Sequence, residues 1–259
     1  ACLSQLLSMP VASFWSDAWE RHPVHARAER AATGRFSGIF SLADLDGVLR
    51  MNVSTHGKHH SAPRPNRNFH DLALLKRVER RGEFWTGKLG KEDEGVSLHA
   101  LKAGFMQGFS LLLNGLERRV PAVSRLCASL EAHTRARCNA NLYLTPAGAQ
   151  AFEAHFDWMD SVVLQIEGAK TWTLYPPVWP LPRKGTKFKP TRAQLDARAS
   201  SATRVTLRAG DALYVPRGVV HECAAPRLGG GAQSLHVTVG ILVDDLTYEG
   251  LIHHAIDRA

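Results

Sequence analysis

The chain has 259 residues, of which 44% are hydrophobic, and its formal net charge is +8. This length and hydrophobic fraction allow one large domain, or a barrel preceded by a helical region, with a sizeable core. The sequence has no membrane-spanning apolar run and no secretory signal, so we expect an intracellular protein without membrane contact. The four cysteines show neither disulfide nor zinc spacing, which is typical of a reducing compartment.

The first half of the chain is mainly helical in pattern. Helices are expected up to about residue 53, followed by a flexible loop over 54–70. The pattern then predicts a short strand over Val96–Leu101 and helices over Phe105–Leu113 and Val120–His133. We therefore interpret residues 1–135 as an N-terminal helical region with one early strand beside a barrel.

The second half, residues 136–259, has the pattern of short strands that form a small barrel. Ser161–Gly168 and Lys170–Pro177 are interpreted as a hairpin, and Gly210-Asp211 as a turn between two further strands. A basic, proline-rich insertion over 178–203 interrupts the strands, and a closing helix is expected over Asp244–Arg258. The fold class is therefore mainly β with flanking helices.

Two histidines and one aspartate provide a set of metal ligands. His155 and Asp157 are two positions apart, so on a strand both side chains point to the same face. His221 follows in the phrase Tyr214–His221 and supplies the second imidazole. Two histidines and a carboxylate occupy one face of an octahedron in non-haem Fe(II) oxygenases and leave the other positions for reactants. A bare His-x-Asp is also common by chance, and a histidine at a strand end is often structural.

Several segments resemble the JmjC-type Fe(II)- and 2-oxoglutarate-dependent oxygenases, in particular the ribosomal-oxygenase branch. Besides the metal motif, the resemblance is carried by Phe14–Pro23, Asn141–Pro146 and Ser234–Gly240. It implies a double-stranded β-helix (a jelly-roll or cupin barrel), Fe(II) bound by the three ligands above, and 2-oxoglutarate and O2 as co-substrates.

The same resemblance implies four residues that bind the co-substrate. Lys170 matches the basic residue that pairs with the distal carboxylate of 2-oxoglutarate, and Tyr143 matches a tyrosine that hydrogen-bonds the same group. Asn141 and Thr238 are further candidates for this pocket. Lys170 could instead be a solvated lysine beside a turn, and Tyr143 a strand aromatic. However, Lys170 alternates with Trp172 and Leu174, so a solvent-facing Lys170 would expose apolar side chains too.

The implied activity is hydroxylation of a residue in a ribosomal or other translation-linked protein. Three alternatives remain: a JmjC histone lysine demethylase, with the same chemistry on an N-methyl group, a non-oxygenase cupin that binds metal for structure or regulation, and an oxygenase of small molecules. If the source is eukaryotic, the resemblance places the protein in the nucleus or nucleolus, and otherwise in the cytoplasm.

The excess of positive charge is concentrated in Arg64–Arg67, Lys76–Arg81 and the 183–192 part of the insertion. It indicates either an acidic or nucleic-acid-associated partner or simply a solvated basic surface. No nucleic-acid-binding motif accompanies it, so direct nucleic-acid binding is not expected. Ribosomal oxygenases continue into a helical dimerisation region and a winged-helix-like domain. A dimer is therefore expected only if such a C-terminal region is present.

Overall fold

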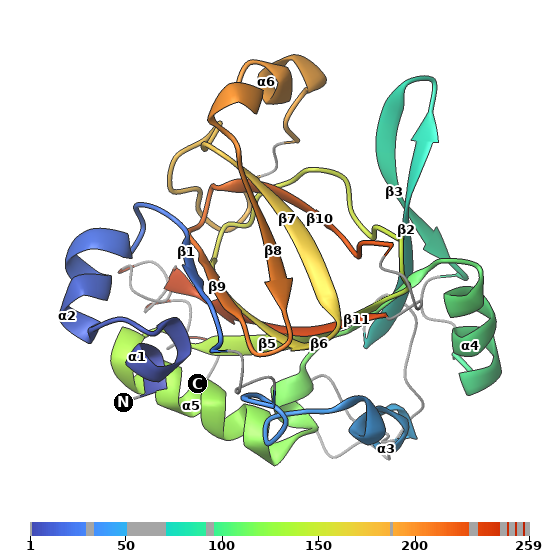
Figure 1. Cartoon of the computed structure of the whole chain (residues 1–259), viewed down its shortest axis with the longest axis horizontal. Coiled ribbons are helices and arrows are strands. Elements are labelled where there is room, and N and C mark those ends of the chain that lie inside the picture. Colours follow the sequence, from blue (N-terminus) through green and yellow to red (C-terminus); the bar gives the residue numbers. More distant parts are fainter. Residues whose placement is uncertain are drawn as a thin grey trace.

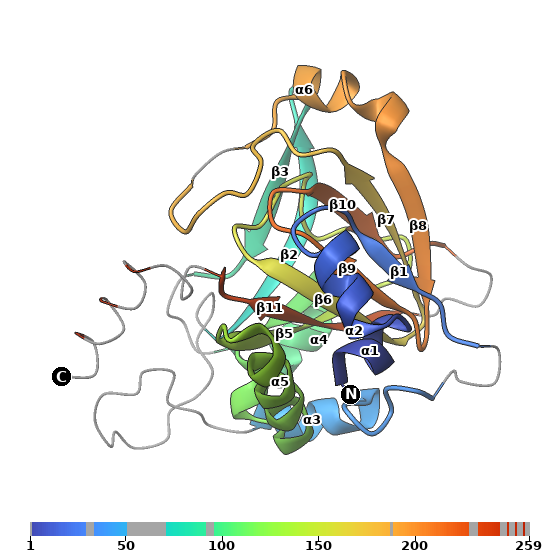
Figure 2. The same cartoon turned by 90° about the vertical axis from the view of Figure 1, so that its left-hand side faces the viewer.

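The computed structural model describes residues 2–29, 34–50, 71–91, 96–186, 189–227 and 233–243, together with Tyr248, Ile252 and Ile256. Two antiparallel sheets face each other, and helices lie on the outer side of the larger one (Figures 1 and 2). Within this described part of the chain, no helix is both long enough and apolar enough to span a membrane.

The strands are β1 (Val24–Ala26), β2 (Leu72–Arg80), β3 (Glu83–Leu89), β4 (Ser110–Leu113), β5 (Cys138–Thr145), β6 (Asp160–Glu167), β7 (Ala169–Tyr175), β8 (Thr203–Arg208), β9 (Ala212–Val215), β10 (Val220–Ala224) and β11 (Ser234–Ile241). The helical elements are α1 (Cys2–Leu7), α2 (Val11–Ser13), the π-helix η1 (Phe14–Ala18), η2 (Leu42–Asp44), α3 (Leu45–Arg50), α4 (Leu98–Met106), η3 (Leu116–Arg118), α5 (Pro121–Thr134), α6 (Arg192–Asp196) and η4 (Ala199–Ser201).

The larger sheet has eight strands in the order β1-β9-β6-β11-β5-β4-β2-β3, and the smaller has three in the order β10-β7-β8. In the larger sheet, the central strands β6 and β11 are buried almost throughout, because helices cover one face of this sheet and the smaller sheet covers the other. The main core lies on the helical side, where α1 and α5 pack on the sheet. A second apolar cluster, which includes Val163, Trp172 and Leu213, lies between the two sheets.

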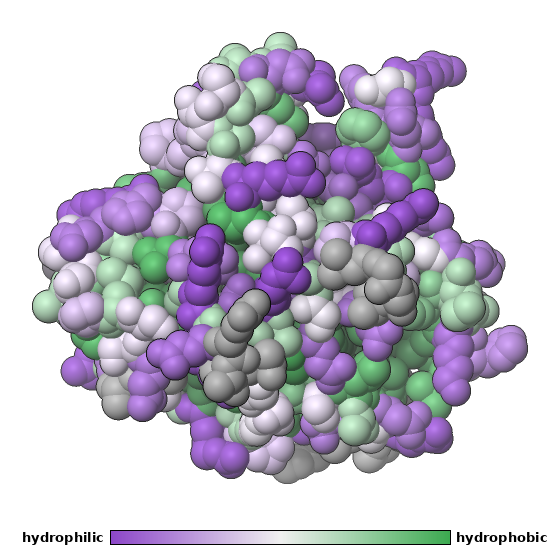
Figure 3. Space-filling model, in the orientation of Figure 1, coloured by the Kyte–Doolittle hydropathy of each residue, from purple (hydrophilic) through white to green (hydrophobic). Residues whose placement is uncertain are grey.

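The smaller sheet separates apolar and polar side chains by the two-residue period of a strand. On β7, Lys170, Trp172 and Leu174 are buried, whereas Thr171 and Thr173 are partly exposed. On the neighbouring edge strand β8, only Leu207 is buried. Figure 3 accordingly shows mostly hydrophilic or neutral residues over β7 and β8. The inner face of this sheet is therefore the one that can line a site.

The predicted mainly β architecture is confirmed, but three local predictions are wrong. Val96–Leu101 is not a strand: it enters α4, whose first turn is capped by the Ser97 side chain accepting from the Ala100 N–H at 3.1 Å. Phe105–Leu113 is not one helix, because the chain leaves α4 at Gly108, which has a φ of +85°, and enters β4. Apolar and polar residues alternate in the sequence V-S-L-H-A-L as they do in a strand. Only the helix-capping residue Ser97 indicates that the segment starts a helix.

The predicted hairpin of Ser161–Gly168 and Lys170–Pro177 is the third error. β6 pairs with β9 and β11 in the larger sheet, while β7 pairs with β8 and β10 in the smaller one. A single residue, Gly168, joins the two strands with a φ of +66°. The chain therefore turns a corner between sheets. A strand buried on both faces needs a neighbour on each side, which a simple hairpin does not supply.

The remaining predictions concern one long helix, the insertion, the domain division, the loop 54–70 and the closing helix. The helix over Val120–His133 is confirmed as α5. The insertion 178–203 stays a prediction; its described residues include the short helices α6 and η4, and its last residue begins β8. The division at residue 135 stays a prediction; β1 to β4 lie before it and belong to the same sheet as β5. The loop 54–70, with the basic cluster Arg64–Arg67, lies outside the described residues. The predicted closing helix over Asp244–Arg258 also lies outside the described residues, except for Tyr248, Ile252 and Ile256, which have helical backbone.

Candidate functional site

The structure brings His155, Asp157 and His221 together as a candidate metal centre. One ligand atom from each lies within 4.8 Å of the other two. His221 Nε2 is 3.8 Å from Asp157 Oδ2, and the two imidazole centroids are 4.5 Å apart. A set of two imidazoles and one carboxylate suits Fe(II) and leaves coordination positions for other ligands.

Backbone hydrogen bonds fix the orientation of both imidazoles. The Nδ1 of His155 is 2.8 Å from the carbonyl oxygen of Glu153, and the Nδ1 of His221 is 3.0 Å from that of Val219. A carbonyl only accepts, so each Nδ1 carries the proton and each Nε2 keeps its lone pair for a metal. The donor set therefore fits a divalent transition metal in tautomer as well as in residue type.

The protonation state of His221 also suits metal binding. Its side chain is 8% exposed, against 39% for Asp157. Burial, together with the charge of His155, lowers the pKa of His221 from 6.5 to about 4, although Asp157 acts in the opposite direction. The imidazole is thus neutral at physiological pH, and its lone pair need not compete with a proton.

The ligand-bearing segment is not the regular strand that the sequence pattern predicted. His155 forms an isolated antiparallel bridge with His221, in which the two residues exchange backbone hydrogen bonds of 3.0 and 2.7 Å. Asp157 lies on irregular backbone, and its carbonyl accepts from the Gly218 N–H at 3.0 Å. The bridge at His155 and the contact with Gly218 hold the two ends of the motif.

A cavity of about 220 Å³ opens beside the three ligands, between the two sheets. It is lined by Tyr143, Ala151, Phe152, His155, Asp157, Ser161, Val163, Lys170, Trp172, Val215, His221, Cys223, His236 and Thr238. Half of these side chains are apolar or aromatic. The polar ones include the three candidate metal ligands and Lys170, so the cavity offers both a metal centre and a basic side chain.

Lys170 is a fully buried lysine that lines this cavity. Its side chain is 1% exposed, and its Nζ donates to the Thr145 hydroxyl at 2.6 Å. In the described part of the chain it has no carboxylate partner. Burial consequently lowers the pKa of Lys170 from its ordinary value of 10.5. An ammonium in such a place requires an anion to offset its lost hydration.

The other three predicted co-substrate residues lie on β5 and β11. Tyr143 and Thr238 line the cavity, and burial raises the pKa of the Tyr143 phenol above 10. Asn141 is not among the lining residues: its Oδ1 accepts from the Gly115 N–H at 3.3 Å, and its side chain also hydrogen-bonds Tyr143. Asn141 thus contacts Tyr143 and helps to orient it without lining the cavity itself.

Sequence reasoning did not identify His236 as a cavity residue. It pairs with Tyr143 across β5 and β11, and the two rings stack with centroids 4.7 Å apart and an interplanar angle of 5°. Burial lowers the pKa of His236 well below 6.5, so the ring is neutral. The alternation of Leu235 to Val239 could have placed His236 on the same face as Thr238, but not opposite Tyr143.

Comparison with known proteins shows the family to which the chain belongs. The JmjC domain family matches residues 116–247. The bifunctional lysine-specific demethylase and histidyl-hydroxylase NO66 of Dictyostelium discoideum is 36% identical over 239 residues, which are 91% of this chain and 41% of that relative. Ribosomal oxygenase 1 of Homo sapiens is 30% identical over 232 residues, or 89% of this chain and 32% of the relative. The chain thus spans less than half the length of these relatives.

Among solved structures, YcfD, a ribosomal oxygenase from Escherichia coli, aligns with a TM-score of 0.57 at 15% identity, over 97% of this chain and 55% of that one. A complex of the same protein with cobalt and 2-oxoglutarate aligns with a TM-score of 0.53 at 16% identity, over 97% and 57% of the two chains. These similarities confirm the double-stranded β-helix fold. With a family match over half of its length, the chain belongs to the JmjC domain family.

Proposed function

We propose that the chain is an Fe(II)- and 2-oxoglutarate-dependent protein hydroxylase. The observation that carries this proposal is the buried amino group of Lys170, which has no carboxylate partner in the described residues and lies in the cavity that also holds His155, Asp157 and His221. A ligand that satisfies both places has an anionic group at one end and a metal-chelating group at the other. 2-Oxoglutarate has both.

When bound, Fe(II) with 2-oxoglutarate and O2 supplies the oxidising power that converts a C–H bond to C–OH and releases succinate and CO2. The residues of the chain provide the geometry. His155, Asp157 and His221 would hold the metal, and Lys170 would pair with the distal carboxylate of the co-substrate, with Tyr143 and Thr238 beside it. Val163, Trp172 and Val215 form an apolar wall that excludes water from the reactants.

The proposed substrate is a ribosomal or other translation-linked protein. The names of the relatives support it, since they include ribosomal oxygenase and histidyl-hydroxylase. A protein substrate also agrees with Asp157, whose side chain is 39% exposed and lies at the accessible side of the metal centre. A nuclear or nucleolar location, if the source is eukaryotic, is part of the same proposal.

A lysine demethylase is the second candidate, because the Dictyostelium relative carries both activities in its name. The two differ in the fate of the oxidised carbon. A hydroxylated side chain retains the new oxygen, whereas a hydroxylated N-methyl group is lost as formaldehyde. A metal-binding cupin without oxygenase activity would leave the buried Lys170 without a role.

The test is incubation of the Fe(II)-loaded protein with 2-oxoglutarate and pools of ribosomal-protein or methylated histone peptides, followed by peptide mass analysis. A gain of one oxygen on a ribosomal-protein peptide, dependent on 2-oxoglutarate, is the expected result. Loss of a methylene from a histone peptide would favour the demethylase. The hydroxylase proposal fails if neither change occurs although metal and 2-oxoglutarate both bind.

A further inference from the structure

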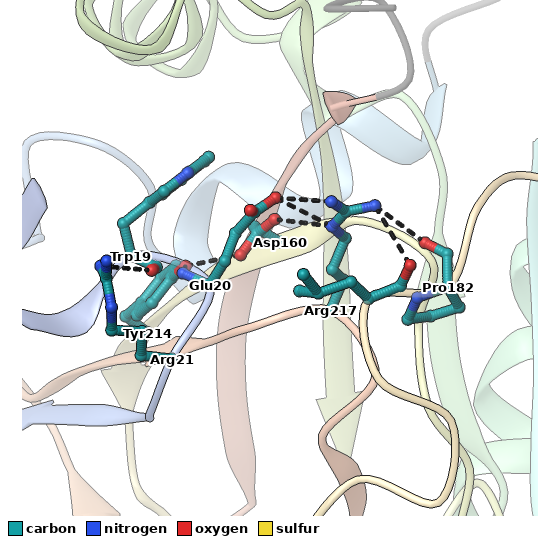
Figure 4. Close-up of polar contacts among 8 residues, drawn as sticks. Trp19, Glu20, Arg21, Asp160, Pro182, Tyr214 and Arg217 are labelled. Carbon is teal, nitrogen blue, oxygen red and sulfur yellow. Dashed lines mark hydrogen bonds and ion pairs between the residues drawn. The ribbon is translucent and has the colours of Figure 1, made fainter.

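Arg217 lies in the loop between β9 and β10 and joins three separate parts of the chain (Figure 4). Its Nε and one terminal nitrogen donate to Glu20 Oε1 at 3.0 and 2.7 Å. The other terminal nitrogen donates to the carbonyl oxygens of Leu181 at 3.5 Å and Pro182 at 3.1 Å. The guanidinium thus connects the N-terminal segment and the insertion to the loop that precedes His221.

Behind this ion pair lies a buried carboxylate, that of Asp160 at the start of β6. Asp160 is 0% exposed, and its Oδ1 accepts from the Tyr214 hydroxyl at 2.5 Å. The Tyr214 oxygen accepts in turn from the Glu20 N–H at 3.0 Å. In the described part of the chain Asp160 Oδ2 has no hydrogen-bond partner, and the Nε of Arg217 lies 3.9 Å from it. Arg217 therefore offsets the charge of two carboxylates, one of them fully buried.

The residues that follow Arg217 hold the metal ligands directly. The Gly218 N–H donates to the carbonyl of Asp157 at 3.0 Å, and the Val219 carbonyl accepts from His221 Nδ1 at 3.0 Å. The loop itself is closed by a 3.2 Å bond from the Val219 N–H to Pro216. A shift of this short loop would move Asp157 and turn the His221 ring.

The insertion packs closely against the same loop on the side away from Glu20 and Asp160. Gly218 has a φ of +84°, and a Cβ atom there would come within 2.7 Å of the Trp179 carbonyl and 2.8 Å of Pro182 Cδ. The loop is therefore held between the insertion and the pair of Glu20 and Asp160.

We propose that Arg217 is a positioning residue for the metal centre: it fixes the loop 216–219 so that Asp157 and His221 keep their ligand geometry, and it ties that geometry to the position of the insertion. The inference depends on the proposed function only for the identity of the metal. It uses no contact between Arg217 and the reactants.

The test is a titration with Mn(II) alone, in which free Mn(II) is quantified by electron paramagnetic resonance. Arg217→Met removes the charge but keeps most of the stem, and we expect at least about tenfold weaker Mn(II) binding, as for other groups that orient metal ligands. Arg217→Lys keeps the positive charge but loses the two-pronged guanidinium geometry. Its Mn(II) affinity should therefore lie between that of Arg217→Met and that of the wild type. Arg21→Met is the matched control, because within the described residues Arg21 donates only to the carbonyls of Trp15 and Trp19.

Wild-type Mn(II) affinity in a folded Arg217→Met protein, even with a lower melting temperature, would mean that Arg217 only stabilises the fold and would overturn the proposal. If Arg217→Met does not fold, Arg217→Lys decides, and unchanged affinity there overturns it equally. The titration contains no 2-oxoglutarate, so failure of the proposed hydroxylase would leave this result unaffected. Absence of Mn(II) binding in the wild type would instead remove the metal centre and both proposals.

Discussion

At the scale of single residues, the site contains two kinds of polar group that lack a full set of partners within the described residues: the imidazole Nε2 atoms and the Lys170 amino group. Backbone carbonyls fix the imidazoles of His155 and His221, and in the described residues neither Nε2 atom makes a hydrogen bond. Lys170 is buried without a carboxylate partner in the same part of the chain. Both arrangements cost free energy in the apo protein, because polar groups lose hydration without full compensation. Such costs are expected where binding restores the missing partner.

Replacing a metal ligand should separate binding from folding. We expect Asp157→Ala to lower metal affinity by roughly 100-fold or more, since one of three protein ligands is lost. The apo protein should keep a cooperative thermal transition, because the Asp157 side chain is 39% exposed and outside the core. Mn(II) titration and thermal melts of the same samples check both parts. Metal affinity equal to that of the wild type would remove Asp157 from the centre.

Lys170→Met should have opposite effects on the apo and the co-substrate-bound protein. A charge-assisted hydrogen bond contributes about 1.5 to 3 kcal/mol, so 2-oxoglutarate binding should weaken roughly 10- to 100-fold. Stability of the apo protein should stay the same or rise, since an uncompensated buried charge is removed. Calorimetric titration and urea unfolding measure the two quantities, with the exposed Lys102→Met as the control. A destabilised variant with unaltered 2-oxoglutarate affinity would indicate that Lys170 is purely structural.

The residue types of the site could be predicted from the sequence, but their neighbours could not. His155, Asp157 and His221 were identifiable by ligand chemistry, and the burial of Lys170 followed from its alternation with Trp172. The stacking of Tyr143 on His236 depends on the register between β5 and β11. Nothing local to either strand specifies that register, since it is set by the long-range packing of the sheet.

At the scale of secondary-structure elements, the corner between β6 and β7 explains how the site is enclosed. β6 contributes Ser161 and Val163 to the cavity from one sheet, and β7 contributes Lys170 and Trp172 from the other. Sequence reasoning predicted both strands but placed them side by side, because adjacent strands with a glycine between them usually form a hairpin. In the structure only Gly168 connects the two strands, which is shorter than a two-residue hairpin turn.

Gly168→Ala should destabilise the protein more than an ordinary glycine replacement. Gly168 has a φ of +66°, and a Cβ atom there would overlap the carbonyl oxygen of Gln233. Gly82→Ala is the matched control, because Gly82 has a φ of +78° with open space around it, and should cost only the backbone strain of about 1 kcal/mol. We expect a loss of roughly 3 kcal/mol or more for Gly168→Ala from urea unfolding. Equal losses would show that the corner relaxes without cost.

At the scale of the whole molecule, the N-terminal segment, the larger sheet and the insertion meet at Glu20, Asp160 and Arg217 (Figure 4). Sequence patterns did not predict this network, since its members are far apart in the chain. Burial raises the pKa of Asp160 from 3.8 to about 6, although Tyr214 and Arg217 partly oppose the effect. The network therefore connects overall stability to pH.

Asp160→Asn should change the pH dependence of stability. Between about pH 4 and 6 the folded wild type holds a proton on Asp160 that the unfolded chain has lost, so its unfolding free energy falls as pH rises. The asparagine variant lacks this titration, and its stability relative to the wild type should increase by about 2 kcal/mol from pH 4 to 7. The opposite effect of His221 is common to both proteins and cancels. Urea unfolding across this pH range gives the difference, and a flat difference would show that Asp160 titrates normally.

Calorimetric titration of 2-oxoglutarate into the apo and the Mn(II)-loaded protein, without O2, tests directly whether the metal and the co-substrate share this cavity. If one cavity holds both a metal and the dicarboxylate, binding should require Mn(II), disappear in Asp157→Ala and weaken in Lys170→Met. Binding of equal strength with and without Mn(II), or no binding by protein that demonstrably holds Mn(II), would contradict the assignment of this cavity as the site of a 2-oxoglutarate-dependent oxygenase.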